Sequence, residues 1–185
     1  MTLKERINRW RQDFGYGVHS PLGYRIVKEV LNPPRGYAFY GYDRIDAMAA
    51  ALPDPHMEKR ARMLLRLGAE FQPALIWHSP GTPEIYVESL RLAGGIVRIF
   101  DGALFPDEMQ KGELVLIVGS LPEGMEDVIS RPDKILVCFD IGEDNVKKLT
   151  DMLKKGVMFD AVDSALIITG SGLSPMLYTV SKSLV

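Results

Sequence analysis

Polar residues that could take part in binding or catalysis stand directly after short apolar runs of the chain. His78 and Ser79 follow residues 74–77, Asp101 and Gly102 follow residues 96–100, and Gly119 follows residues 114–118. A histidine with an ordinary pKa of about 6.5 can act as a general base, and a carboxylate at this spacing can accept hydrogen bonds from a ribose. Because glycine leaves bare backbone for a ligand to lie against, these residue types indicate a small-molecule site.

Each of these candidates has a simpler alternative. His78 has no acidic partner that the sequence identifies, so it can equally be a loop histidine bonded to nearby backbone. Asp101 can be a solvated carboxylate at a strand end, and Gly102 can simply make a turn. The catalytic residues therefore stay unassigned.

The elements that would position these residues follow from the apolar runs. Runs at residues 74–77, 96–100, 114–118 and 135–139 alternate with amphipathic stretches, which predicts βαβ units and a parallel sheet. The runs lack polar alternation, as expected for strands covered on both faces. After a helix ended by Gly156, residues 159–162, 165–168 and 176–180 predict three closing strands, at least one of them antiparallel.

The first third of the chain reads as helical. Thr2 and Glu5 form a capping box, Ser20 and Pro21 form an N-cap followed by the first helical residue, and Asp54 caps a helix over residues 56–71. A helix is also expected over residues 43–52, after an aromatic connector over residues 35–42. We expect a helical extension over residues 1–54 and an α/β domain over residues 55–185.

Charge is distributed unevenly along the chain. Residues 1–36 carry seven basic and three acidic side chains, a local charge of +4, whereas the whole chain has a net charge of -2. Such asymmetry can mark a nucleic-acid arm or the solvated face of amphipathic helices. Because there is no dense Lys/Arg run, the solvated face is favoured and nucleic acid is not the expected partner. Pairing of two copies through the N-terminal helices is a further possibility.

The cysteine content and the hydropathy of the sequence indicate the cellular compartment in which we expect the protein. The single cysteine, Cys138, lies inside an apolar run, which predicts a buried thiol and excludes an intramolecular disulfide. The N-terminal residues lack a signal-peptide apolar core, and the sequence contains no stretch of about 18 apolar residues. We therefore expect a cytoplasmic protein with no membrane partner.

The segment Gly17-Val18-His19-Ser20-Pro21-Leu22 resembles the G-[IV]-H-S-P-F element that heads a group of bacterial methyltransferase-like proteins, with Leu22 in place of phenylalanine. The order of helices, alternating strands and terminal hairpin is also similar to the class I S-adenosylmethionine-dependent methyltransferase fold. The resemblance spans nearly the whole chain. It implies a Rossmann-like α/β fold with a mostly parallel sheet and antiparallel C-terminal strands, preceded by a helical extension.

The resemblance also implies a place for S-adenosylmethionine at the carboxyl ends of the first strands. The residues that it assigns to the cofactor are His78, Ser79, Gly81, Asp101, Gly102 and Gly119.

The chain departs from the family pattern at two of these points. Pro80 and Pro83 each remove a backbone donor from the loop, although Thr82 followed by Pro83 predicts an N-cap and first helical residue. Val118 stands where the family has an acid, and Asp140 is one acid of a usual pair that can also cap the next helix. A valine can neither bind a hard cation nor accept a proton, so no metal is expected.

Three functions are compatible with this pattern. The favoured one is a methyltransferase-like protein with degenerate S-adenosylmethionine-binding motifs that serves as a non-catalytic binding or assembly module for a small-molecule ligand or a partner. The alternative is an active methyltransferase that acts on a small molecule with a non-standard cofactor loop, since methyl transfer needs mainly positioning. A nucleic-acid binder that uses the basic N-terminal helices ranks last.

Overall fold

The fold is that of a computed structural model, which describes residues 2–34, 39–94, 97–102, 108–170 and 172–180. Contacts within the chain divide it into two compact units. Unit 1 comprises Met1–Gln72, Pro83–Ile96 and Lys182–Val185, and unit 2 comprises Pro73–Thr82 and Val97–Ser181. The expected boundary after residue 54 concerns independent folding and stays a prediction.

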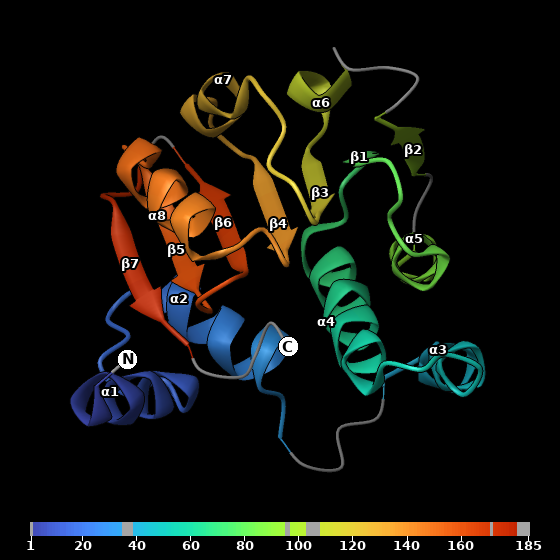
Figure 1. Ribbon diagram of the computed structural model, residues 1–185, viewed down its shortest axis with the longest axis horizontal. Coiled ribbons are helices and arrows are strands. Elements are labelled where there is room, and N and C mark those ends of the chain that lie inside the picture. The colour runs from blue at the N-terminus through green and yellow to red at the C-terminus, as the bar shows by residue number, and fades with distance from the viewer. Residues whose placement is uncertain (1, 35–38, 95–96, 103–107, 171, 181–185) are drawn as a thin grey trace. The chain divides into compact units, whose positions relative to one another are not determined.

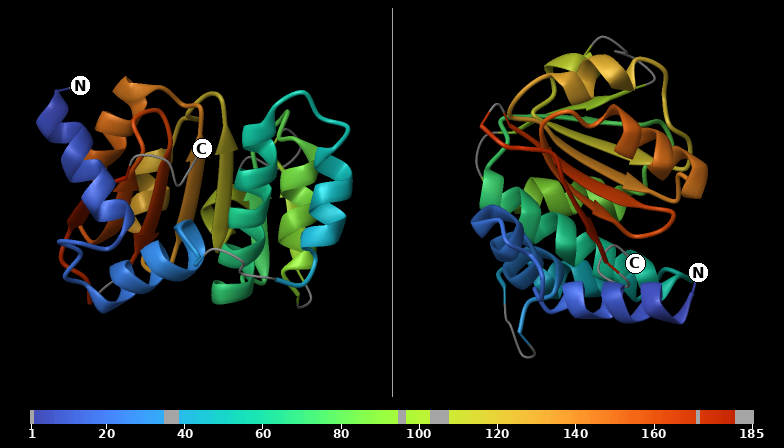
Figure 2. Two further views of the ribbon diagram at one scale, coloured as in Figure 1. Left: turned by 90° about the horizontal axis from the view of Figure 1, so that it is seen from below. Right: turned by 90° about the vertical axis from the view of Figure 1, so that its left-hand side faces the viewer.

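Unit 1 is helical where the structure describes it (Figure 1). Its helices are α1 (Leu3–Asp13), α2 (Pro21–Arg25), the π-helix η1 (Ile26–Leu31), α3 (Tyr42–Ala49), α4 (Pro55–Phe71) and α5 (Glu84–Leu92). Helices α3, α4 and α5 lie side by side (Figure 2, left). Gly68 allows the close approach of α4 and α5, because a Cβ built there would lie 2.6 Å from the Cβ of Ala93.

Local sequence signals start three of these helices, as predicted. The amide of Thr2 donates to Glu5 Oε2 at 2.6 Å and the amide of Glu5 donates to Thr2 Oγ1 at 3.3 Å. The side chains of Ser20 and Asp54 accept from the amides of Gly23 and His56. These bonds satisfy backbone donors that the first helical turn leaves unpaired.

The helix that begins at Pro21 differs from a plain α-helix. It is α-helical only to Arg25 and then continues as the π-helix η1, where the amide of Asn32 donates to the carbonyl of Val27 at 2.8 Å. Helix α3 also ends three residues before the expected Leu52, at Ala49.

The described part of the aromatic connector is packed within unit 1, whereas its residues 35–38 lie outside the described residues. The Phe39 ring stacks on Tyr40 at 4.9 Å between centroids, and the Arg62 guanidinium lies 4.8 Å from the centre of the Tyr42 ring. Buried Arg66 on α4 donates to the Tyr42 hydroxyl at 2.6 Å. The prediction of a packed connector is confirmed for Phe39 and Tyr42, which are half-buried, whereas Tyr40 is exposed.

Unit 2 contains one sheet of seven strands (Figure 1), with the order β2-β1-β3-β4-β6-β5-β7. Strand β6 runs antiparallel to its neighbours β4 and β5, and the other neighbouring pairs are parallel. An α/β fold with a mostly parallel sheet and an antiparallel C-terminal strand is therefore confirmed. The strands are β1 (Leu75–His78), β2 (Arg98–Asp101), β3 (Leu114–Val118), β4 (Ile135–Phe139), β5 (Gly156–Asp160), β6 (Ala165–Thr169) and β7 (Met176–Thr179).

The position of Gly156 corrects one expectation. It is the first residue of β5 rather than the end of a helix, and β5 begins three residues earlier than predicted. Its φ is +136°, and a Cβ built there would lie 2.9 Å from Thr169 Cα on β6. Glycine is required here because β6 passes too close for a side chain.

One face of the sheet carries helices of unit 2 itself. These are α6 (Glu108–Lys111), α7 (Met125–Ser130) and α8 (Glu143–Met152), and α7 and α8 lie on the same side of the strands in the right-hand view of Figure 2. Val128 and Leu149 from these helices pack with Val115, Leu136 and Cys138 from the strands in one buried cluster. The predicted burial of Cys138 is confirmed.

Among the described residues, none of the helices combines the length and the apolar character needed to cross a membrane.

Candidate functional site

The order of strands defines where a ligand would lie on unit 2. Strand β1 pairs with β2 on one side and with β3 on the other, so the chain changes direction across the sheet at β1. Open α/β sheets bind ligands at the carboxyl ends of strands beside such a switch point. Here those ends are His78 and Val118, and the register pairs His78 with Asp101.

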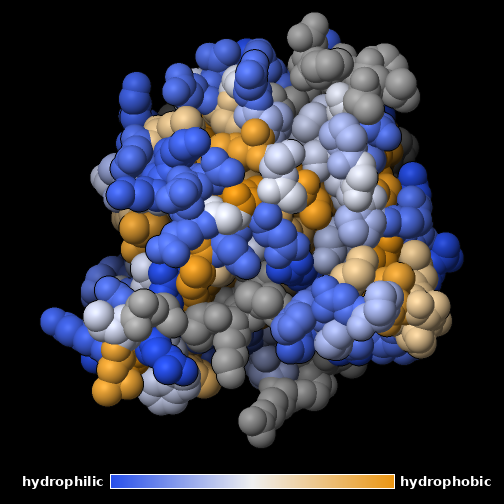
Figure 3. Space-filling model, viewed as in Figure 1, coloured by the Kyte–Doolittle hydropathy of each residue, from blue (hydrophilic) through white to orange (hydrophobic). Residues whose placement is uncertain are grey.

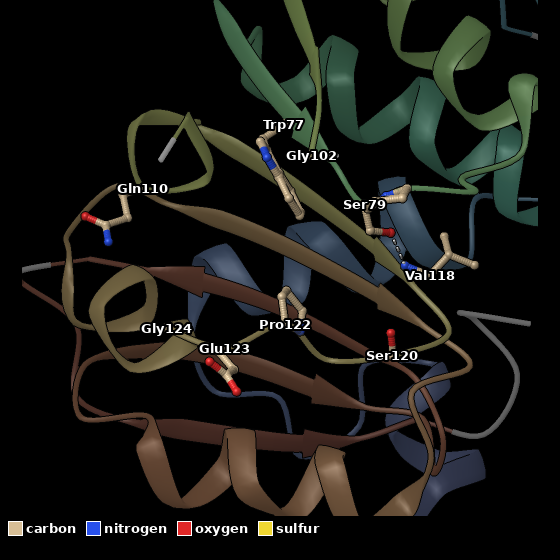
Figure 4. A pocket seen from close by; sticks show the side chains of 10 residues that line it. Trp77, Ser79, Gly102, Gln110, Val118, Ser120, Pro122, Glu123 and Gly124 are labelled. Atoms are coloured by element: carbon tan, nitrogen blue, oxygen red, sulfur yellow. Dashed lines mark hydrogen bonds between the residues drawn. The ribbon is translucent and has the colours of Figure 1, made fainter. Parts of the chain in front are cut away.

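A cavity of about 520 Å³ lies at this switch point and continues along β1 and β3 (Figure 4). We name it the Trp77 pocket. Ser79 and Val118 lie near its end at the carboxyl edge, and Gln110 of α6 lies at the other end (Figure 4). Its lining residues are Trp77, Ser79, Pro80, Gly102, Gln110, Val118, Ser120, Pro122, Glu123 and Gly124.

The predicted site residues divide between this pocket and the strand edge beside it. Ser79 and Gly102 line the Trp77 pocket. The other four predicted residues, which do not line it, are His78, Gly81, Asp101 and Gly119. Two of the six predicted residues therefore line the cavity, and the assignment of all six to a ligand stays a prediction.

Ser79 fastens the end of β1 to the end of β3. Its hydroxyl accepts a hydrogen bond from the amide of Val118 at 2.9 Å, and its amide donates to the carbonyl of Leu116 at 2.9 Å. The side chain is buried, with 5% of its surface exposed. The Ser79 hydroxyl therefore already bonds within the sheet, and any ligand would share it with the amide of Val118.

The loop after Ser79 is closed by its own hydrogen bonds. The Thr82 hydroxyl donates to the Ser79 carbonyl at 2.7 Å, and the His78 ring nitrogen Nδ1 lies 3.1 Å from the same oxygen. The prediction that Thr82 caps the next helix is wrong: α5 begins at Glu84 with Pro83 at its N-cap. The reason is that the Thr82 hydroxyl turns back to the loop instead of forward to the helix.

Gly102 is packed against an aromatic ring. A Cβ built on it would lie 2.6 Å from Trp77 Cε2 and 2.9 Å from the carbonyl oxygen of His78. Its amide donates to that same carbonyl at 2.8 Å. The absent side chain of Gly102 thus makes room for the Trp77 indole, and no comparable space is left for a ligand between them.

Gly81 and Gly119, unlike Gly102, lie beside open space. Their φ values are +75° and +86°, and a Cβ built on either would meet no atom within 4 Å. The amide of Gly119 donates to the carbonyl of Phe139 at 2.9 Å. These two glycines therefore make tight turns beside open space, which is the situation that a ligand in contact with backbone requires.

Trp77 carries the most informative polar atom of the pocket. The side chain is only 3% exposed, and its indole Nε1 is buried without a hydrogen-bond partner among the described residues. Leaving a buried donor unsatisfied costs about 1–3 kcal/mol, and buried tryptophans usually find an acceptor. The sequence placed Trp77 at the end of the first apolar run and gave it no role in a site; its polar ring nitrogen was the signal that could have marked it.

Few charged side chains line the Trp77 pocket. Among the described lining residues, Glu123 is the only ionisable side chain, and it is exposed. Asp140 follows β4 with a φ of +55°, and the expectation that it caps α8 is wrong because Gly142 occupies the N-cap. Within the described part of the chain, no group of three or more His, Cys, Asp or Glu residues could hold a metal ion.

No protein-family model matches the chain, and no curated protein matches it at a significant level. Membership of the methyltransferase family therefore stays a prediction from the residues quoted above.

Proposed function

We propose that this chain is a methyltransferase-like protein that binds a small molecule in the Trp77 pocket and does not transfer methyl groups. The observation that carries the proposal is the buried Nε1 of Trp77, which has no partner among the described residues, on a side chain that lines a cavity of about 520 Å³. Because Nε1 has almost no accessible surface, a ligand reaches it only when the indole ring turns toward the cavity, and an acceptor placed there would relieve the cost of burying it.

The rest of the pocket suits a small organic molecule. Its volume lies within the range of about 300–1,000 Å³ that is common for ligand pockets. The Trp77 ring, Pro80 and Pro122 supply apolar surface, whereas Ser120 and Gln110 supply polar groups. Such a combination of apolar walls and a few polar anchors is the usual composition of a binding site.

S-adenosylmethionine fits these residues only in part. The hydroxyl of Ser79 already accepts from Val118, and the space above Gly102 is filled by the Trp77 indole. Both residues belong to the set that the resemblance assigns to the cofactor. Their engagement within the sheet supports a protein that keeps the scaffold and has given up the usual cofactor contacts.

Active methyl transfer is the second candidate, and a specific observation favours it. Gly81 and Gly119 turn beside open space, and the β1–β2 register pairs His78 with Asp101 at the same edge. A cofactor could lie outside the Trp77 pocket against these two turns. Methyl transfer by positioning alone would then need no general base.

Calorimetric titration with S-adenosylmethionine and S-adenosylhomocysteine separates the two candidates. The proposal expects no saturable binding below about 1 mM, a range in which even a weak site releases measurable heat. Micromolar binding that Asp101→Ala abolishes, and that the matched control Asp140→Ala preserves, would contradict the proposal and favour the second candidate.

The pocket itself can be tested through the two indole N–H signals of the chain, from Trp10 and Trp77. In proton–nitrogen correlation spectra, benzamide should move the Trp77 indole signal downfield, because its carbonyl accepts from Nε1. Ethylbenzene has a similar shape and no acceptor, and it should leave that signal near its original position. The exposed Trp10 signal serves as the internal reference. Equal effects of the two compounds on Trp77 would contradict the proposal.

A further inference from the structure

A second cavity in unit 2 is lined by cationic side chains. It has a volume of about 250 Å³ and lies where three segments meet: the end of α7, the turn between α8 and β5, and the end of β6. Arg131, Lys154 and Lys155 contribute positive charge, and Ile129 and Pro132 contribute apolar surface. Among its described lining residues there is no acidic side chain. We name this cavity the basic cleft.

The wall of the basic cleft is fixed by one buried hydroxyl. Thr169, which is 3% exposed, donates from Oγ1 to the carbonyl of Arg131 at 2.7 Å and accepts from the amide of Lys134 at 2.9 Å. The amide of Asp133 donates to the carbonyl of Thr169 at 3.2 Å. These bonds hold the loop from Arg131 to Lys134 against the end of β6, so a ligand would not have to order it.

The guanidinium of Arg131 is also held in place. Its Nη2 donates to Gln110 Oε1 at 2.9 Å and its Nη1 donates to the Gln110 carbonyl at 3.5 Å. A guanidinium presents five donors in a planar fork, so these two bonds leave three donors for a ligand. Lys154 and Lys155 are exposed, and the ion pairs found in the described part of the chain do not include them.

A further cation, Lys134, follows Arg131 closely along the chain. Lys134 is buried, and its ammonium group donates to the carbonyls of Gly112 at 2.8 Å and Lys111 at 3.4 Å instead of to a carboxylate. Burial, followed by the charge of Arg131, lowers the pKa of Lys134, whereas the carboxylates of Glu113 and Asp133 raise it. The positive charge of the cleft itself comes from Arg131, Lys154 and Lys155.

We propose that the basic cleft binds the phosphate group of a small organic phosphate. Two lysines and an arginine match a doubly charged phosphate better than a singly charged carboxylate, because arginine can bind it in a bidentate manner and the lysines add point charges. Ile129 and Pro132 would contact the apolar part of the ligand. The basic cleft shares no lining residue with the Trp77 pocket, although Arg131 bonds to Gln110 of that pocket, and the proposal does not depend on the function proposed for the Trp77 pocket.

The test compares phenyl phosphate, inorganic phosphate and benzoate at constant ionic strength, by calorimetry and by the phosphorus resonance of the two phosphates. Phenyl phosphate should bind saturably and more tightly than inorganic phosphate, because only it reaches the apolar wall. Benzoate should bind more weakly than phenyl phosphate, because it carries one charge. Tighter binding of benzoate, or the absence of saturable phenyl phosphate binding, would overturn the proposal.

Matched variants locate the binding. The double substitution Lys154→Gln and Lys155→Gln should weaken phenyl phosphate binding about tenfold or more, since charge-assisted hydrogen bonds are lost. Lys147→Gln removes a charge from the exposed surface of α8 outside the cleft and should change the affinity less than about twofold. Equal affinities in the double variant and the wild type would sink the assignment.

A short single-stranded DNA provides the last arm. If the DNA binds more tightly than phenyl phosphate and loses affinity in the same double variant, the cleft recognises a nucleic-acid backbone and the small-ligand proposal is wrong.

Discussion

Gly102 shows how one residue without a side chain determines the shape of the Trp77 pocket. Replacing it by alanine would place a methyl group against the Trp77 ring and the His78 carbonyl. We expect Gly102→Ala to lower the free energy of unfolding by about 1–3 kcal/mol, as overpacked cores do. Urea unfolding measures the loss. Gly172→Ala is the control, because a Cβ there meets no atom within 4 Å, and it should change stability by less than about 0.5 kcal/mol.

The buried thiol of Cys138 predicts how the stability of the protein depends on pH. Burial raises the pKa of its thiol to about 12, whereas an unfolded cysteine has a pKa of about 8.5. Above that value the unfolded chain loses the thiol proton and the folded chain keeps it, so stability is present below about pH 8.5 and is lost as the pH rises toward 12. The loss at pH 10 should be about 2 kcal/mol.

The measurement compares unfolding free energies at pH 7 and pH 10 for the wild type and Cys138→Ala. The variant should be less stable at both pH values, because it leaves a cavity, but it should lose less stability between them. Lys134, whose pKa is lowered by burial, acts in the opposite direction in both proteins and so cancels from the comparison. Identical losses in the two proteins would mean that the thiol opens to solvent without unfolding.

At the scale of elements, α1 carries an apolar stripe on its surface. The exposed fractions are 73% for Leu3, 51% for Ile7, 58% for Trp10 and 51% for Phe14, and Figure 3 shows apolar side chains at the surface over α1. Exposed apolar patches of this kind often mark interaction sites. An antiparallel pair of α1 helices would place Leu3 opposite Phe14 and Ile7 opposite Trp10, matching a smaller side chain with a ring.

We therefore expect a homodimer through α1, and light scattering coupled to size-exclusion chromatography tests it. The wild type should elute with twice the mass of one chain, and Ile7→Arg should shift it to the monomer because it places a charge inside the stripe. Asn8→Arg adds the same charge on another side of the helix and should leave the dimer intact. A wild type that stays monomeric at every concentration would exclude this interface.

The elements also show what the sequence could and could not predict. The helix starts at Thr2, Ser20 and Asp54 were predictable because each cap bonds to residues two or three positions away. Thr82 was not, because its hydroxyl could either accept from an amide of the helix or donate to the loop, and it donates to the carbonyl of Ser79. The local sequence pattern thus predicts a helix start well, and it predicts less well where a loop and a helix compete for the same capping hydroxyl.

At the scale of the whole molecule, features that depend on tertiary contacts could not be predicted from the sequence. The apolar runs over residues 74–77, 96–100 and 114–118 predicted the three strands, whose ends at His78 and Asp101 lie one residue beyond the run and whose end at Val118 coincides with it. The contact of Trp77 with Gly102 depends on the register between β1 and β2, which periodicity does not contain. The basic cleft likewise gathers Arg131, Lys154 and Gly170 from three separate connections, so no local motif could have marked it.

The division into two units leads to a final prediction about cooperativity. The chain passes between the units four times, and α5 of unit 1 joins β1 and β2 of unit 2. Neither unit is a continuous segment, so unfolding one removes a connection that the other needs for its strand pairing. We therefore expect a single two-state transition in urea rather than two separate ones.

The two tryptophans allow this to be measured, because Trp10 belongs to unit 1 and Trp77 to unit 2. In Trp10→Phe, indole fluorescence reports unit 2 through Trp77, while helical circular dichroism is dominated by α1 to α5 of unit 1. The two signals should give the same midpoint within error, as coincident probes do in a two-state transition. If residues 1–54 form an independent extension instead, the helical signal should show an additional transition that the fluorescence of Trp77 does not follow.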